Sequence, residues 1–445
     1  MDGERKNIPM EEKEMSFVET MEYIDSLRAY GVVPGLDNMR RLCARLENPQ
    51  DDLKFVHIAG TNGKGSVLCF LSAVLAQEGY RVGSYSSPAV ADYRDTIQTG
   101  GRMISRAWLC RGMTRIRTAC RALVEAGYPH PTLFEAQTAL AFLYFKEKKC
   151  DIVVLETGMG GELDATNIVK STVVSVFTPV SMDHVGVLGN SLAQIAWTKS
   201  GIIKAKGRAV SSQQEPEALE AIRLRCREQN ASLTVTDLKA LVKKKSTLAK
   251  QTFSYGERKN LEISLAGRYQ TENAALAIEA LDVLSECGYP VTDKALRAGL
   301  LGARWPGRFQ ILGTNPLFIA DGAHNAAAAA RLADTLGFYF RGEKLIYIMG
   351  MLRDKDHEAV IKQTCPLAGT VLTVPTPGER GLSAYELAGE VMKYHGDVTA
   401  LDSVEEAVEI AYMLSGGKTP VIAFGSLSYL GKLMETVDNR NKKKK

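Results

Sequence analysis

A glycine-rich segment with one lysine, Gly60-Thr61-Asn62-Gly63-Lys64-Gly65-Ser66, is the part of this sequence best suited to bind phosphate. It follows an apolar run at 54–59, which is typical of a strand, and opens a helical pattern at 64–77. Glycines let the backbone wrap closely around a phosphate, and the free N–H groups at the start of a helix point at the anion. Lys64 supplies positive charge for the β and γ phosphates, and Ser66 could coordinate Mg²⁺.

This segment is a variant of the P-loop. The strict pattern requires Ser or Thr directly after the lysine, and here Gly65 intervenes. The alternative interpretation is a glycine-rich turn between a strand and a helix. The lysine and the position between the two elements favour phosphate binding.

Polar residues lie at or just after the carboxyl ends of three further predicted strands. Glu156 ends one apolar run, Asp183-His184 follows the next, and Asp321-Gly322-Ala323-His324-Asn325 follows a third in the C-terminal part. In α/β proteins the carboxyl ends of strands hold the ligands. Glu156 therefore suits a hard metal ion, with a simple glycine-rich connection as the alternative. His184 is either a metal ligand or an ordinary structural histidine.

Two other residues have weaker local signals. Arg308 lies beside the break Trp305-Pro306-Gly307, where it could reach phosphates across a cleft or form an interdomain salt bridge. Lys199 lies in the helical pattern 191–203, and from the sequence alone it resembles an ordinary surface lysine.

The elements that must position these residues alternate along the chain. Short β-branched runs at 54–59, 81–85, 151–156 and 172–177 lack polar alternation, which predicts parallel strands buried on both faces. Helical patterns separate them. We expect a surface excursion over 231–259, where the pattern weakens.

The break at Trp305-Pro306-Gly307 predicts two domains. The fold class is α/β. We expect residues 1–303 to form a domain of P-loop type with a mainly parallel sheet. We expect residues 304–445 to form a smaller α/β domain, with a phosphate-binding cleft between the two.

Bulk composition narrows the function classes. The chain has 445 residues, 24% of them charged, and a net charge of only +4, so nothing predicts a nucleic-acid or membrane partner. Its eight cysteines are scattered and form no Cys-x-x-Cys pair, which fits a reducing compartment. Residues 1–14 are charged and contain no apolar signal core. We expect a cytoplasmic monomer.

Taken in order, the motifs resemble the folylpolyglutamate synthase and dihydrofolate synthase family, a branch of the Mur ligase group. The resemblance runs from Phe17 to Lys432. It rests on the segments 60–66, 86–88, 132–135, 163–167, 183–184, 199–204 and 321–325.

The resemblance implies a role for each matching position. The catalytic residues would be Lys64, His184 and Lys199, the last carbamylated, and Mg²⁺ would be held by Ser87, Glu156 and His184. ATP would contact Thr61, Asn62, Gly63, Lys64, Gly65, Ser66, Asn273, Arg308, Asp321 and His324. The folate would contact Thr132, Leu133, Phe134, Glu135, Leu163, Asp164 and Ala165.

The same resemblance implies an ATP-dependent ligase that adds L-glutamate to the carboxylate of a folate through an acyl phosphate. One alternative is a dihydrofolate synthase, or a bifunctional enzyme, acting on dihydropteroate. Another, from a different class, is a non-catalytic protein that binds folate or nucleotide. The sequence departs from the family at Ala89-Val90, Asp95-Thr96, Glu162 and Ala326. The first three lie near the expected substrate side and leave the preferred folate open.

Overall fold

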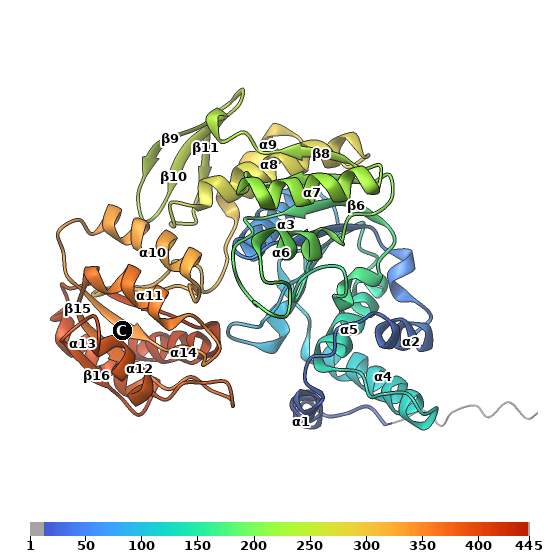
Figure 1. Ribbon diagram of the computed structural model, residues 1–445. Helices are drawn as coiled ribbons and strands as arrows, with labels where there is room; N and C mark the ends of the chain where they lie inside the picture. The colour runs from blue at the N-terminus through green and yellow to red at the C-terminus, as the bar shows by residue number, and fades with distance from the viewer. Residues whose placement is uncertain (1–12, 444–445) are drawn as a thin grey trace, which may run out of the picture.

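The protein is described here by a computed structural model covering residues 13–443, in which two α/β units lie side by side (Figure 1). Most of the charged segment 1–14 lies outside the described residues. Within 13–443, no helix is both long enough and apolar enough to cross a membrane.

The first unit is built on an eight-stranded sheet in the order β4-β3-β2-β5-β1-β6-β7-β8. Neighbouring strands in the run β2-β5-β1-β6-β7-β8 pair in parallel. At one edge β3 pairs antiparallel with both β2 and β4. The bounds are β1 Phe55–Ala59, β2 Val82–Tyr85, β3 Ile97–Thr99, β4 Arg102–Met103, β5 Ile152–Glu156, β6 Thr172–Phe177, β7 Arg208–Ser211 and β8 Ser232–Val235.

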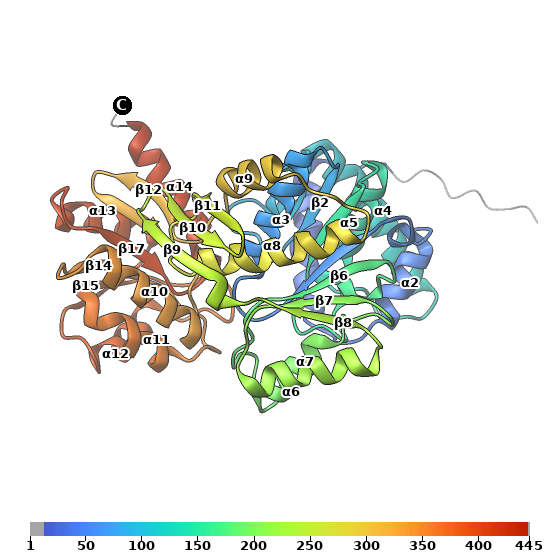
Figure 2. The ribbon, with the colours of Figure 1, turned by 90° about the horizontal axis from the view of Figure 1, so that it is seen from above.

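Helices cover both faces of this sheet (Figure 2). Phe55 of β1 packs with the helices α2, α4 and α5, whereas its neighbours Val56 and Ile58 pack with α3, α8 and α9. The prediction of buried parallel strands is thus confirmed. The helices are α1 Phe17–Ser26, α2 Asp37–Arg45, α3 Lys64–Glu78, α4 Arg106–Glu125, α5 Leu133–Glu147, α6 Leu192–Ser200, α7 Pro216–Glu228, α8 Gln270–Glu286 and α9 Asp293–Gly302.

A three-stranded antiparallel sheet follows β8, and the sequence did not predict it. It consists of β9 Leu241–Ser246, β10 Gln251–Tyr255 and β11 Arg258–Ile263. β9 carries exposed lysines, which conceal the strand pattern, but Phe253 and Leu261 are fully buried and pack in the cluster that includes α8. The predicted surface excursion is therefore a folded ribbon standing beside α10 (Figure 1).

The second unit is a smaller six-stranded sheet in the order β12-β13-β17-β14-β15-β16, parallel except for the β12–β13 pair. The predicted fold class is confirmed, while the boundary between residues 303 and 304 stays a prediction. The elements are β12 Gln310–Thr314, β13 Leu317–Ala320, α10 Ala326–Tyr339, β14 Leu345–Met349, α11 His357–Thr364, β15 Ala368–Thr373, α12 Ala384–Met392, β16 Val398–Ala400, α13 Val404–Ser415, β17 Val421–Phe424 and α14 Leu427–Lys443.

Candidate active site

A cavity of about 350 Å³ lies between the two units. One wall comes from the loop between β1 and α3 and from α8, and the other comes from the start of the C-terminal unit. Of the residues predicted to contact ATP, seven line the cavity: Asn62, Gly63, Gly65, Ser66, Asn273, Arg308 and Asp321. Thr61, Lys64 and His324 do not line it.

The phosphate loop depends on glycine at two places. Gly63 has φ +90° and begins α3 without a side-chain cap, so the first N–H groups of the helix are left for a ligand. A Cβ at Gly65 would lie 2.7 Å from the indole of Trp305, so only glycine fits against this ring. Lys64 folds back over the loop, and its Nζ donates to the carbonyls of Gly60 and Thr61, both at 3.3 Å.

Glu156 lies beside this lysine at the end of β5. Its Oε1 is 3.8 Å from Lys64 Nζ. Burial raises the pKa of Glu156, while Lys64, Arg308 and the backbone N–H of Ser87 oppose that shift. A buried carboxylate in this position is suited to a cation, because a cation would offset its desolvation.

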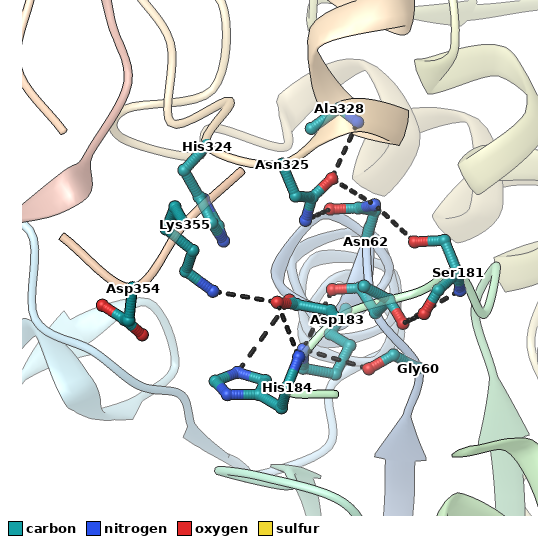
Figure 3. Close-up of polar contacts among 12 residues, drawn as sticks. Gly60, Asn62, Ser181, Asp183, His184, His324, Asn325, Ala328, Asp354 and Lys355 are labelled. Atoms are coloured by element: carbon teal, nitrogen blue, oxygen red, sulfur yellow. Dashed lines mark hydrogen bonds and ion pairs between the residues drawn. The ribbon is translucent and has the colours of Figure 1, made fainter. Parts of the chain in front are cut away.

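His184 lies in the loop after β6 with φ +51°, an unusual conformation for a residue other than glycine. Its backbone N–H donates to Asp183 Oδ1 at 3.0 Å, and the same carboxylate accepts from Lys355 Nζ at 2.9 Å (Figure 3). Burial opposes ionisation of Asp183, but Lys355 lowers its pKa to about 2. This ion pair crosses from one unit to the other.

Lys199 is not a surface residue. Lys199 belongs to α6, and its side chain is buried. Its Nζ donates to the Gly60 carbonyl at 2.9 Å, so Lys199 contacts the start of the phosphate loop. Burial and the neighbouring Lys64 lower the pKa of Lys199 to about 7. The amine is therefore partly neutral near physiological pH.

Among the predicted metal ligands, Glu156 lies beside Lys64 and accepts from the Ser87 N–H, and the charge of Lys64 also acts on His184. Within the part of the chain that the structure describes, no group of three or more His, Cys, Asp or Glu side chains is placed to hold a metal. Only Glu156 and His184 among the predicted ligands are of those types. A site with few protein ligands fits Mg²⁺, which usually keeps several waters and binds phosphate oxygens as well.

Asp321 organises the C-terminal wall of the cavity. Its Oδ2 accepts from the Tyr269 hydroxyl at 3.1 Å and from the Phe309 N–H at 2.8 Å. Burial raises the pKa of Asp321, and Arg308 opposes this shift. Burial also lowers the pKa of His324 to about 4, so this ring is neutral at pH 7. Its Nδ1 lies 2.7 Å from the Gly322 carbonyl and must donate to it.

A reciprocal pair of amides joins the two walls. Asn62 of the phosphate loop and Asn325, the N-cap of α10, each donate to the other at 3.2 and 3.1 Å (Figure 3). The phosphate loop is therefore tied directly to the second unit.

Comparison with known proteins places this site in a family. Residues 58–281 match the Mur ligase middle domain, and residues 307–427 match the Mur ligase glutamate ligase domain. The chain is 34% identical to dihydrofolate synthase/folylpolyglutamate synthase of Bacillus subtilis, across 80% of this chain and 84% of that one. It is 31% identical to folylpolyglutamate synthase of Lacticaseibacillus casei, across 95% and 99%. The chain belongs to the folylpolyglutamate synthase and dihydrofolate synthase family of Mur ligases.

The solved structures agree with this family assignment. Folylpolyglutamate synthase of Mycobacterium tuberculosis, complexed with ADP, superimposes with a TM-score of 0.88 at 28% identity and covers 95% of this chain and 99% of that one. The family consists of ATP-dependent ligases, and this chain is one. The interpretation as a non-catalytic binding protein is not supported.

In this Mur ligase three of the residues predicted to contact folate, Thr132, Phe134 and Glu135, have structural partners. Thr132 caps α5, and its N–H and hydroxyl both donate to Glu135 Oε2, at 2.8 and 2.9 Å, in a reciprocal capping box. Leu133 is half-buried. Phe134 packs so closely on Gly158 that a Cβ there would lie 2.4 Å from its ring. Phe134 is thus placed beside the loop after β5.

That loop carries the remaining predicted folate contacts. Leu163 is 54% exposed, whereas Asp164 and Ala165 are buried. Asp164 accepts from the Met159 N–H at 2.7 Å and from the Thr166 N–H at 3.1 Å. Its carboxylate therefore closes the loop on itself.

The departures from the family pattern have different surroundings. Val90 was expected on the substrate side, but it packs against the C-terminal unit, where its carbonyl would clash with a Cβ at Gly431. Glu162 forms an ion pair with Arg225 at 3.0 Å, and Arg225 lies over the ring of Trp197. Glu162 thus joins to α7 the loop 157–164 after β5, called the folate-side loop here because it carries predicted folate contacts.

Sequence reasoning missed Lys355. This residue follows β14, so the same rule of strand ends that pointed to Glu156 and His184 could have found it.

Proposed function

We propose that this chain adds L-glutamate to the terminal carboxylate of a folate, consuming ATP and releasing ADP and phosphate. The observation that carries the proposal is the cavity in which the phosphate loop and the C-terminal Arg308 and Asp321 face each other. The likeness to folylpolyglutamate synthases supports the identity of the substrates.

The chemistry follows from the poor electrophilicity of a carboxylate. Transfer of the γ-phosphoryl group of ATP to the folate carboxylate forms an acyl phosphate and gives the carbon a leaving group. The amino group of glutamate then attacks that carbon, and phosphate leaves. The protein chiefly positions the reactants and stabilises charge.

The residues have separable tasks in this scheme. The free N–H groups at the start of α3 and the Lys64 ammonium would hold the phosphates. Arg308 would neutralise charge from the opposite wall of the cavity. The contacts between the units, such as Asn62 with Asn325, would exclude water, which otherwise hydrolyses an acyl phosphate.

Mg²⁺ fits the group of residues around Glu156. We infer that Glu156, His184 and Ser87 hold it, because a buried carboxylate beside a phosphate loop suits a hard cation. Bound there, Mg²⁺ would neutralise charge on the phosphate oxygens.

Lys199 is proposed to be carbamylated. The neutral amine is the form that adds CO₂, and its lowered pKa makes that form accessible near pH 7. The test is Lys199→Ala assayed with and without added acetate. Carbamylation predicts a large loss of activity that acetate partly restores. Full activity of the variant would contradict any role for the lysine.

The remaining expectations concern the setting of the enzyme. We infer a cytoplasmic protein, supported by the eight cysteines, all of which are free thiols. We infer a monomer, supported by a cavity whose two walls both come from this one chain. The expected absence of nucleic-acid and membrane partners stays a prediction.

The proposed function is tested by ADP release in a substrate screen. Dihydropteroate, dihydrofolate, tetrahydrofolate and its one-carbon forms are each supplied with ATP, Mg²⁺ and L-glutamate. ADP release that requires both a folate and glutamate supports the proposal. Release with dihydropteroate alone among the pterins would instead favour the dihydrofolate synthase activity. No release with any pterin would overturn both.

A further inference from the structure

We propose that His57 is a positioning residue which, through Thr166, fixes Asp164 and holds the folate-side loop in register with the phosphate loop. The inference rests on the proposed function. It assigns a role to a buried histidine that makes no contact with the cavity.

The three side chains form a continuous buried chain. His57 Nε2 lies 2.8 Å from Thr166 Oγ1, and this hydroxyl lies 2.5 Å from Asp164 Oδ1. His57 and Thr166 are completely buried, and Asp164 is 6% exposed. Burial shields the three side chains from bulk water, so a hydrogen bond lost between them is not readily replaced by one to water.

The direction of the hydrogen bonds follows from the carboxylate. Burial raises the pKa of Asp164, but the N–H groups of Met159, Thr166 and Gly158 and the hydroxyl of Thr166 oppose that and favour the ionised form. An ionised carboxylate only accepts, so the Thr166 hydroxyl must donate to it. The hydroxyl has no second proton, and His57 must therefore donate from Nε2.

The other ring nitrogen of His57, Nδ1, is left without a hydrogen-bond partner in this arrangement of the described residues. Burial lowers the pKa of His57 well below its usual value, so the ring is neutral and Nδ1 is an acceptor. Nδ1 is fully buried and has no hydrogen-bond partner in the described residues 13–443. An apolar side chain would fill the same space without this unpaired acceptor. The histidine thus contributes its donor to Thr166 rather than stability to the core.

The hydrogen bonds from His57 through Thr166 to Asp164 link the two halves of the active site. His57 is in the middle of β1, and this strand leads directly into the phosphate loop at Gly60. Asp164 closes the loop after β5, in which Gly158 contacts Phe134. Phosphoryl transfer needs the donor phosphate and the acceptor carboxylate aligned to a fraction of an ångström. One strand therefore sets the positions of both.

The experiment compares four single variants of the full-length enzyme. His57→Leu removes the donor at similar volume, whereas His57→Gln keeps an N–H donor at similar reach. Thr166→Val removes the hydroxyl. Ser175→Ala is the matched control, because Ser175 pairs with His57 in the sheet and its buried hydroxyl donates to the Ile202 carbonyl, away from the chain of hydrogen bonds.

The expected result is a defect confined to folate. His57→Leu and Thr166→Val each raise KM for the folate about tenfold or more, the usual effect of losing a hydrogen bond that supports a charged group. Binding of ADP, measured by calorimetry, stays within about twofold. His57→Gln restores much of the folate KM, and Ser175→Ala changes only the melting temperature. The double variant His57→Leu/Thr166→Val is no worse than the worse single one, because both break the same chain.

Other outcomes would overturn the inference. A lower melting temperature with unchanged folate KM in both His57→Leu and Thr166→Val would make these residues ordinary core. An equal loss of affinity for ATP and for folate would also make them ordinary core residues. If His57→Leu does not fold, Thr166→Val with His57→Gln decides the question. Wild-type enzyme that consumes no ATP with any folate would instead refute the proposed function, a result that these variants do not affect.

Discussion

Replacing Lys64 by methionine tests the phosphate site most directly. The ammonium is already held by two loop carbonyls at 3.3 Å and by Glu156 at 3.8 Å, and its side chain is only 17% exposed. It therefore approaches the phosphates as a preorganised charge. Loss of one such contact at a reacting centre lowers kcat by about 10²–10³, which corresponds to about 2.7–4 kcal/mol of transition-state stabilisation.

The fold should survive this change. Lys64 attracts Glu156 but repels Lys199, and burial together with this repulsion lowers the pKa of Lys199. The two effects oppose each other, so the melting temperature should move little. Methionine retains most of the aliphatic stem.

The assay is ADP release with folate and glutamate, together with a thermal melt. Lys344→Met is the matched control, because Lys344 also donates to a backbone carbonyl, that of Pro366, but on the C-terminal unit away from the cavity. Near-normal turnover in folded Lys64→Met protein would refute the assignment of this loop to ATP. A large loss in the control would show that the assay reports general damage.

Replacing Glu156 or His184 by glutamine should raise the Mg²⁺ concentration needed for half-maximal rate, and unchanged Mg²⁺ titrations in both would make them structural. Lys355→Met should lower the unfolding free energy, measured by denaturant titration, by about 3 kcal/mol, because it leaves Asp183 buried without its partner. Adding Asp183→Asn should recover part of this loss, and a Lys355→Met protein as stable as wild type would contradict the prediction. In CO₂-free buffer, the unfolding free energy should rise from about pH 7 to about pH 10, because over this range Lys199 keeps its proton in the unfolded chain but has lost it in the folded chain, where its pKa is about 7. Lys199→Met should lack this part of the rise with pH, and an identical rise in the variant would disprove the burial effect.

Much of the fold could be predicted because its signals are local. The strand, loop and helix that bind phosphate are consecutive, and the positive φ of Gly63 favours glycine itself. The need for glycine at position 65, in contrast, comes from the distant Trp305. The β-branched runs predicted the parallel strands β1, β5 and β6. The ribbon β9–β11 could not be predicted in the same way, since β9 is lysine-rich and mostly exposed, and β10 and β11 each bury only a few apolar side chains, among them Phe253 and Leu261.

The sequence by itself determined the fold class, the phosphate loop and the order of motifs that marks the family. It could not show that Lys199 is buried, because Gly60, to which it donates, is 139 residues away. The contact of Lys355 with Asp183 spans 172 residues, and that of His57 with Thr166 spans 109. Backbone conformation is set largely by neighbours in the chain, whereas burial, pKa and hydrogen-bond partners depend on which distant segments pack together. Only the tertiary structure decides those.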